Sequence, residues 1–130
     1  MQDSLEYQIK SNAEKFIKES KDKEIFVLSH FDTDGITSAT IMIQTLKRLD
    51  KKFKLKIIKS LEEDEVKNLP KDKLILFLDL ASGSLNYLEE SGIENIFIID
   101  HHEVTQQIPK NINMINPELN GKEKISKSLL

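Results

Sequence analysis

Three short runs in this sequence consist only of apolar residues with a strong tendency to form β-strands. They are Ile25 to Leu28, Leu74 to Leu78 and Ile96 to Ile99. Continuous apolar runs of this length are typical of strands that are buried on both faces of a parallel sheet. The sequence therefore predicts three buried strands.

The segments around these runs complete an alternating pattern of strands and helices. Apolar residues that recur every three or four positions predict a helix up to about Ser20 and a second helix from Ile36 to Leu49, capped by Thr37 or a neighbouring polar residue. The remaining elements are predicted as strands from Phe53 to Ile58 and Ile112 to Ile115, and as helices from Glu62 to Leu69 and from about Ser84 through Glu90. Because strands that alternate with helices imply right-handed crossovers, the expected fold class is α/β, a Rossmann-like parallel sheet of about five strands flanked by helices.

Length and composition indicate one water-soluble domain. A chain of 130 residues can close one core but not two ordinary ones, so residues 1–130 are expected to form a single domain. With 38% hydrophobic and 32% charged residues the chain is neither disordered nor collagen-like, and no apolar run is long enough to cross a membrane. The absence of cysteine excludes thiolate metal sites, and together with the polar N-terminus it indicates a cytoplasmic protein.

Histidines and aspartates gather where the predicted buried strands end. The candidate site residues are His30, Asp32, Asp34, Asp79, Asp100, His101 and His102, which include every histidine of the chain. Taken singly, such a residue is more often a cap or a turn residue, and Asp79 could cap the helix that starts near Ser84. In parallel α/β sheets, however, the ligand site lies at the carboxyl ends of the strands, where several carboxylates would repel one another without a cation.

The side chains of this group suit divalent cations. Imidazole and carboxylate ligands without sulfur favour Mn²⁺, Mg²⁺, Fe²⁺ or Zn²⁺, and a carboxylate-rich set favours the harder ions. Two such ions about 3.5–4 Å apart need a bridging carboxylate, and they can activate a shared water and bind phosphate oxygens. Asp79 follows the central strand and is the expected bridge.

Other ligand-binding motifs do not fit the sequence. A calcium EF-hand loop that began at His30 would need Glu at its twelfth position, where this chain has Ile41, and a strand instead of a helix precedes the loop. The glycine-rich phosphate loop of nucleotide triphosphatases and the dinucleotide-binding glycine motif are both missing from the sequence.

Three segments, in order, resemble the first three motifs of the DHH superfamily of phosphoesterases. Ser29 to Ala39 resembles the first motif, Phe77 to Asp79 the second, and Ile98 to Glu103, which contains Asp100-His101-His102, the third. The form of the first motif, with His30 two places before an aspartate, is closest to archaeal RecJ-like exonucleases. The resemblance extends from about Lys23 to Leu130.

This resemblance implies a set of ligands for two divalent cations. Mn²⁺ is the metal expected first, and Mg²⁺ is the alternative. His30 and Asp32 would bind one ion, Asp34 and His101 the other, and Asp79 would bridge them.

The resemblance also implies roles for the remaining two site residues, His102 and Asp100, and an activity for the protein. His102 would face the substrate phosphate, and Asp100 would orient the histidine pair. The expected function is metal-dependent hydrolysis of single-stranded DNA or RNA or of oligonucleotides. The alternative is a noncatalytic scaffold with the same fold in a DNA replication or repair complex. Because archaeal RecJ-like exonucleases include some that associate with the GINS replication complex, the resemblance also implies GINS-like replication proteins as partners.

One departure from the family pattern concerns the end of the sequence. Family members continue through a fourth motif, which adds an aspartate ligand, and through a C-terminal domain, but no aspartate or histidine follows His102. The chain is therefore expected to stop before the fourth motif, and a second chain or segment is expected to supply it. The segment from Ile125 to Leu130 resembles the start of the next helix of the family.

Overall fold

The computed structural model describes residues 4–119 of the chain, and a five-stranded parallel sheet with the order β2-β1-β3-β4-β5 is its centre. The elements are α1 (Leu5–Glu19), β1 (Ile25–His30), α2 (Thr33–Arg48), β2 (Phe53–Ile58), α3 (Glu63–Lys67), β3 (Leu74–Leu78), α4 (Leu85–Glu89), β4 (Ile96–Ile99), β5 (Ile112–Ile115) and a short 3₁₀ helix (Pro117–Leu119). The predicted α/β class is confirmed. The predicted helix at Ile125 lies outside the described residues.

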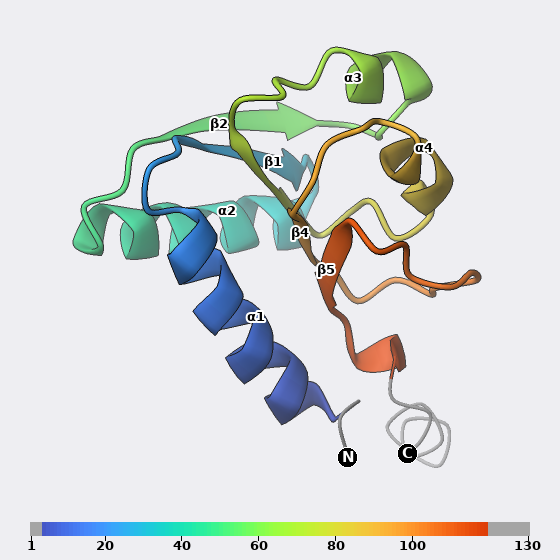
Figure 1. The fold of residues 1–130 in the computed structure, drawn as a ribbon, viewed down its shortest axis with the longest axis horizontal. Helices are drawn as coiled ribbons and strands as arrows, with labels where there is room; N and C mark the ends of the chain where they lie inside the picture. The colour runs from blue at the N-terminus through green and yellow to red at the C-terminus, as the bar shows by residue number, and fades with distance from the viewer. Residues whose placement is uncertain (1–3, 120–130) are drawn as a thin grey trace.

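Helices cover both faces of the sheet (Figure 1), which explains why the central strands are apolar throughout. Side chains alternate between the faces, so neighbours in one strand belong to different cores. Val27 and Leu76 belong to the core beneath α1 and α2, whereas Leu28 and Phe77 belong to the core beneath α3 and α4. Within residues 4–119, no helix has the length and apolar content needed to cross a membrane.

The start of α2 differs from the sequence-based expectation. The helix begins at Thr33 rather than at Ile36, and Asp32 is its N-terminal cap, so the prediction of a cap at Thr37 is wrong. The Asp32 carboxylate accepts a hydrogen bond from the main-chain N–H of Gly35 at 2.9 Å, which satisfies one of the free N–H groups of the first turn. The periodic apolar residues predicted only the part of α2 that packs on the sheet, because the residues of its first turn are mostly polar.

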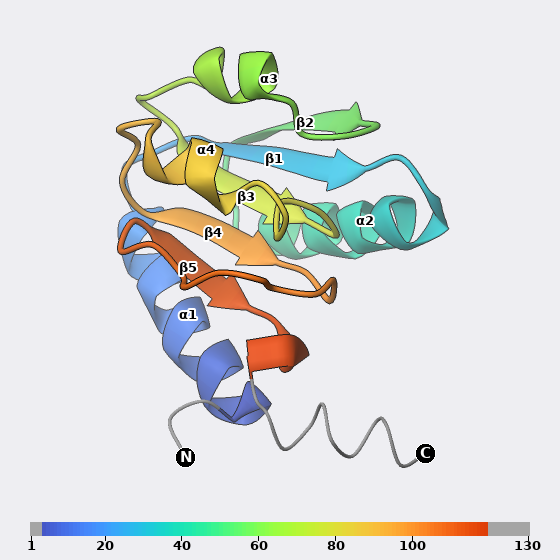
Figure 2. The same cartoon turned by 90° about the vertical axis from the view of Figure 1, so that its right-hand side faces the viewer.

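The carboxyl ends of all five strands point in one direction (Figure 2). Ser29 pairs with Leu78, Leu78 with Ile99, and Ile99 with Ile115. Continuing this register by one residue puts four polar side chains in one row across the edge: His30, Asp79, Asp100 and Asn116. Main-chain hydrogen bonds from Asp79 N to Ile99 O (2.8 Å) and from Asp100 N to Ile115 O (3.1 Å) maintain the row.

Candidate metal centre

The first part of the site is a tight corner between β1 and α2. A Cβ atom on Gly35 would lie 1.9 Å from the carbonyl oxygen of His30, so only glycine allows the first turn of α2 to pack directly on the end of β1. The hydroxyl of buried Ser29 holds the same corner, since it lies 2.7 Å from the Gly35 carbonyl oxygen. This corner brings Asp32 beside His30, with Oδ2 and Nδ1 at 3.0 Å.

Asp79 stands at the centre of the site in an unusual backbone conformation. It follows β3 with a φ of 63°, a left-handed value that non-glycine residues seldom adopt and that Asp tolerates better than most. Its carboxylate is nearly buried, with Oδ1 at 2.8 Å from Nε2 of His101 and Oδ2 at 3.6 Å from Nδ1 of His30. Asp79 does not cap α4, whose cap position is Ser84.

Electrostatics distinguish the two carboxylates of this part of the site. Burial raises the pKa of the Asp79 carboxyl, and the nearby carboxylate of Asp32 adds to that rise, while His101 opposes it. The pKa of Asp32 is lowered, chiefly by the hydrogen bond from the Gly35 N–H. Asp79 is therefore a buried negative charge whose surroundings only partly compensate it.

Two buried atoms at this position make no well-aligned hydrogen bond among the described residues: Nδ1 of His30, although it lies 3.0 Å from Oδ2 of Asp32, and Oδ2 of Asp79. Buried polar atoms are nearly always hydrogen-bonded, so such a pair needs an explanation. One ligand atom each from His30, Asp32 and Asp79 lie within 4.8 Å of one another. Imidazole nitrogen and carboxylate oxygen are ligands of divalent cations, so these residues fit a metal ion.

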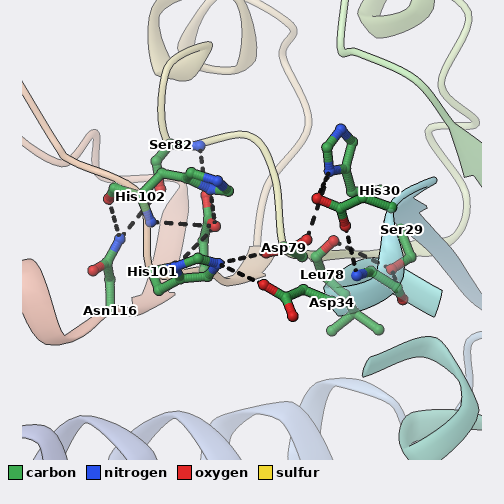
Figure 3. Close-up of polar contacts among 12 residues, drawn as sticks. Ser29, His30, Asp34, Leu78, Asp79, Ser82, His101, His102 and Asn116 are labelled. Carbon is green, nitrogen blue, oxygen red and sulfur yellow. Dashed lines mark hydrogen bonds and ion pairs between the residues drawn. The ribbon is translucent and has the colours of Figure 1, made fainter. Parts of the chain in front are cut away.

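The predicted ligands of a second ion lie nearer the surface. Asp34 is in the first turn of α2, and its Oδ2 lies 3.9 Å from Nε2 of His101 (Figure 3). The side chains of Asp34 and His101 are 72% and 55% exposed. The His101 ring joins this pair to Asp79, and it stacks on the ring of His102 at a centroid distance of 4.4 Å.

The buried carboxylate of Asp100 is surrounded by donors. It accepts hydrogen bonds from the main-chain N–H groups of Ser82 (3.2 Å) and His101 (2.8 Å), and its Oδ1 lies 2.6 Å from Nδ1 of His102. Burial alone would raise the pKa of Asp100, but these bonds together lower it. Desolvation alone would lower the pKa of His102, but the bond to Asp100 raises it. Asp100 thus contacts the ring of His102, whereas the ring of His101 contacts Asp79.

Sequence reasoning missed two residues that support this part of the site, Ser82 and Asn116. Asn116 is fully buried, and its Nδ2 lies 2.9 Å from the carbonyl oxygen of His102 and 3.2 Å from Oγ of Ser82. A signal existed in the sequence, because Asn116 follows a predicted strand at the same edge of the sheet as the aspartates. Ser82 had no such signal, since its contact depends on a turn of the main chain.

Comparisons with known proteins agree with the fold and with the three motifs. Residues 24–128 match the N-terminal domain of the DHH family. The uncharacterized protein MJ0831 of Methanocaldococcus jannaschii is 31% identical over 105 residues, which cover 75% of this chain and 24% of that protein.

Two solved structures have a similar fold. The first is RecJ from Thermus thermophilus in complex with Mn²⁺, with a TM-score of 0.73, 23% identity, and coverage of 90% of this chain and 18% of RecJ. The second is an exonuclease RecJ bound to manganese, with a TM-score of 0.71, 22% identity, and coverage of 87% and 31%. In each comparison this chain spans less than a third of the other protein.

Proposed function

Because the chain belongs to the DHH family, we propose that its sheet edge holds two divalent cations and forms part of a phosphodiesterase that acts on single-stranded nucleic acid or oligonucleotides. One observation carries this proposal: Nδ1 of His30 and Oδ2 of Asp79 are buried, make no hydrogen bond among the described residues, and lie 3.6 Å apart beside the Asp32 carboxylate. A buried carboxylate without a cation is costly, so the pair is best explained by a ligand that enters from solution.

Each predicted metal ligand has a role in this proposal. His30 and Asp32 would hold one cation, Asp34 and His101 the other, and Asp79 would contact both, since its two oxygens face different histidines. Two bound cations would activate a water molecule and neutralise charge on the phosphate oxygens. Mn²⁺ is the first choice and Mg²⁺ the alternative, because the ligand set combines imidazoles with carboxylates.

His102 has a different role from the metal ligands. Its Nδ1 is engaged by Asp100, which leaves Nε2 to face outward from a half-exposed side chain. The bond to Asp100 raises the pKa of His102 despite partial desolvation, which favours a ring that donates to a phosphate oxygen. Asp100 orients this ring and would not bind metal itself.

The scaffold alternative has less support. A protein that served only as a scaffold would gain stability if Asp79 were replaced. Asp79 has a left-handed φ, its carboxyl has a raised pKa, and its Oδ2 makes no hydrogen bond among the described residues. A metal-binding role accounts for all three features.

We expect a further segment or chain to complete the enzyme. Asp34 and His101 are more than half exposed, so the second cation would be held loosely by the described residues, and an open rim does not position a flexible strand for attack.

The test combines calorimetry with an activity assay. Titration with Mn²⁺ should show binding, and Asp79→Asn should weaken it more than about 100-fold, because loss of a direct ligand exceeds the usual effect of an indirect one. Asp50→Asn is the matched control, since Asp50 is exposed and also has a left-handed φ of 57°. Asp50 follows the carboxyl end of α2, whereas the candidate metal ligands lie at its amino end. Equal Mn²⁺ affinity in both variants would remove Asp79 from the site.

Activity is measured as Mn²⁺-dependent cleavage of a labelled single-stranded oligonucleotide, by the chain alone and with a polypeptide that carries the fourth-motif aspartate and C-terminal domain. We expect little cleavage by the chain alone and cleavage by the combination, lost in Asp79→Asn. His102→Ala should lower turnover and leave Mn²⁺ occupancy largely unchanged. No cleavage by the combination would contradict the proposed function and favour the scaffold.

A further inference from the structure

Asn116 uses all of its polar groups to join separate parts of the chain. Its main-chain N–H donates to Oε1 of Gln8 in α1 at 2.8 Å, and its Oδ1 accepts from the N–H of Glu118 at 2.8 Å. Its Nδ2 donates to the carbonyl oxygen of His102 at 2.9 Å and to Oγ of Ser82 at 3.2 Å. A buried side-chain amide whose oxygen and nitrogen both make hydrogen bonds is held in one orientation.

The two Nδ2 bonds close a ring of hydrogen bonds among Ser82, Asp100, His102 and Asn116. Figure 3 labels Ser82, His102 and Asn116 on one side of the site. Asn116 contacts Ser82 and His102, and Asp100 contacts the same two residues from the other side. We call these four residues the polar ring. His102 is thereby held at two points: Asp100 contacts its imidazole and, at 3.4 Å, its main-chain N–H, and Asn116 donates to its main-chain carbonyl oxygen.

The second point of attachment matters because of the backbone around His102. The connection from 100 to 111 contains no helix or strand, so sheet pairing does not fix the main chain at His102. Asp100 accepts the main-chain N–H groups of His101 (2.8 Å) and, at a longer 3.4 Å, of His102, so it holds the main chain on the amino side of His102 only. The bond from Asn116 to the carbonyl oxygen holds the carboxyl side, and Asn116 is itself fixed by the end of β5 and by Gln8.

We propose that Asn116 is a positioning residue that acts through the main chain of His102, and that Gln8 of α1 supports it. The residues that match the DHH family begin at 24, so this assigns a task to a helix outside the matched segment. The part concerning catalysis rests on the proposed function, because it assumes that His102 contacts phosphate. The hydrogen-bond ring does not depend on that assumption.

The informative variant is Asn116→Asp, which keeps the size and the acceptor of the side chain but removes both Nδ2 donors. Asn111→Asp is the matched control: Nδ2 of Asn111 donates to the carbonyl oxygens of Leu88 (2.9 Å) and Ile93 (2.8 Å), near the amino end of β5. Both variants lose two bonds from a side-chain amide, so both should lose global stability. If Asn116→Asp does not fold, Gln8→Leu removes the support without adding a buried charge.

The first measurement needs neither metal nor substrate. Amide hydrogen exchange of Ser82 and His101, whose N–H groups donate to Asp100, is compared with that of Leu76 in β3. In Asn116→Asp, and more weakly in Gln8→Leu, we expect Ser82 and His101 to exchange at least about tenfold faster relative to Leu76, with no such change in Asn111→Asp. Unchanged relative exchange in both test variants would overturn the proposal.

The second measurement separates positioning from stability in the completed enzyme. Asn116→Asp should lower kcat about tenfold while the Mn²⁺ dissociation constant stays within about twofold, and Asn111→Asp should leave kcat unchanged. Equal losses of kcat in the two variants would reduce Asn116 to a structural residue and overturn its positioning role. If the unsubstituted enzyme cleaves nothing, the proposed function fails, and the exchange experiment still decides whether Asn116 organises the polar ring.

Discussion

Asp79 and Asp100 occupy equivalent positions at the ends of adjacent strands, and both are almost buried, at 4% and 5% exposed. Their surroundings differ sharply. Both oxygens of Asp100 accept hydrogen bonds, and its pKa is lowered, whereas one oxygen of Asp79 has no hydrogen-bond partner among the described residues and its pKa is raised. Two carboxylates in one row thus carry opposite electrostatic properties.

The difference indicates how the sheet edge divides its tasks. The chain itself neutralises Asp100, so this residue can hold the His102 loop in place without a ligand. Asp79 is left as an incompletely paired charge beside His30 and His101, so it is available to a cation. Asp100, a fully hydrogen-bonded positioning residue, therefore lies next to Asp79, a candidate ligand with a strained backbone and a raised pKa. This combination is common in functional sites.

The largest expected effect is the destabilisation by Asp100→Asn. The amide would put an NH2 group in place of one of the two carboxylate oxygens, which accept separately from the N–H groups of Ser82 and His101, so at least one of these donors would lose its acceptor. We expect the free energy of unfolding in EDTA to fall by about 3 kcal/mol, measured by urea denaturation. A loss below the error of the method would remove the distinction between the two aspartates.

The next effect concerns the corner that aligns His30 and Asp32. In Gly35→Ala the new Cβ would overlap the His30 carbonyl oxygen, so α2 must shift, at a cost of about 2 kcal/mol. Gly83→Ala is the control, because a Cβ there meets no atom within 4 Å. Mn²⁺ affinity should weaken in Gly35→Ala alone, while exchange protection of the Ser82 amide persists. Equal Mn²⁺ affinity in the two variants would show that this corner does not shape the site.

A smaller effect of opposite sign is expected for Asp79→Asn without metal. Asparagine removes the poorly compensated charge, and it tolerates the left-handed φ of 63°. At neutral pH we expect a gain of about 1 kcal/mol in the free energy of unfolding. Because the folded pKa of Asp79 is raised, the gain should be absent below about pH 4, roughly the unfolded value, should grow as pH rises towards the folded pKa, and should be complete above it. A loss of stability at neutral pH would contradict the comparison.

The smallest effect is the pH dependence of the Asp100–His102 pair. The lowered pKa of Asp100 gives stability that is lost as pH falls through its folded pKa, and the raised pKa of His102 gives stability that is lost as pH rises through its folded pKa. Both contributions should be complete between about pH 4 and 6.5, the unfolded values. Since His102 is half exposed, His102→Gln should remove only the alkaline decline, by less than about 1 kcal/mol in urea titrations. Persistence of that decline would assign it to another group.

Local sequence patterns predicted the fold well, because its strands are defined by local signals. The apolar runs located β1, β3 and β4 to within two residues, and the residues that follow them form the row at the carboxyl edge. The cap at Asp32 was missed because polar residues form the first turn of α2.

The support around His102 was harder to predict, since it depends on register. Ser82, Asp100 and Asn116 are far apart in sequence, and only the pairing of β3, β4 and β5 brings them together. The unpaired oxygen of Asp79 is likewise a property of three-dimensional packing. Residue types at strand ends indicate that a site exists, but not which carboxylate is satisfied.

The most direct test of a metal centre built on Asp79 is crystallographic. Diffraction data are collected from crystals grown with Mn²⁺, at a wavelength where manganese scatters anomalously. We expect an anomalous difference peak within coordination distance of Nδ1 of His30, the carboxylate of Asp32 and Oδ2 of Asp79, and no peak at Asp100. Peaks elsewhere only, or none beside Asp79 at saturating Mn²⁺, would contradict the account.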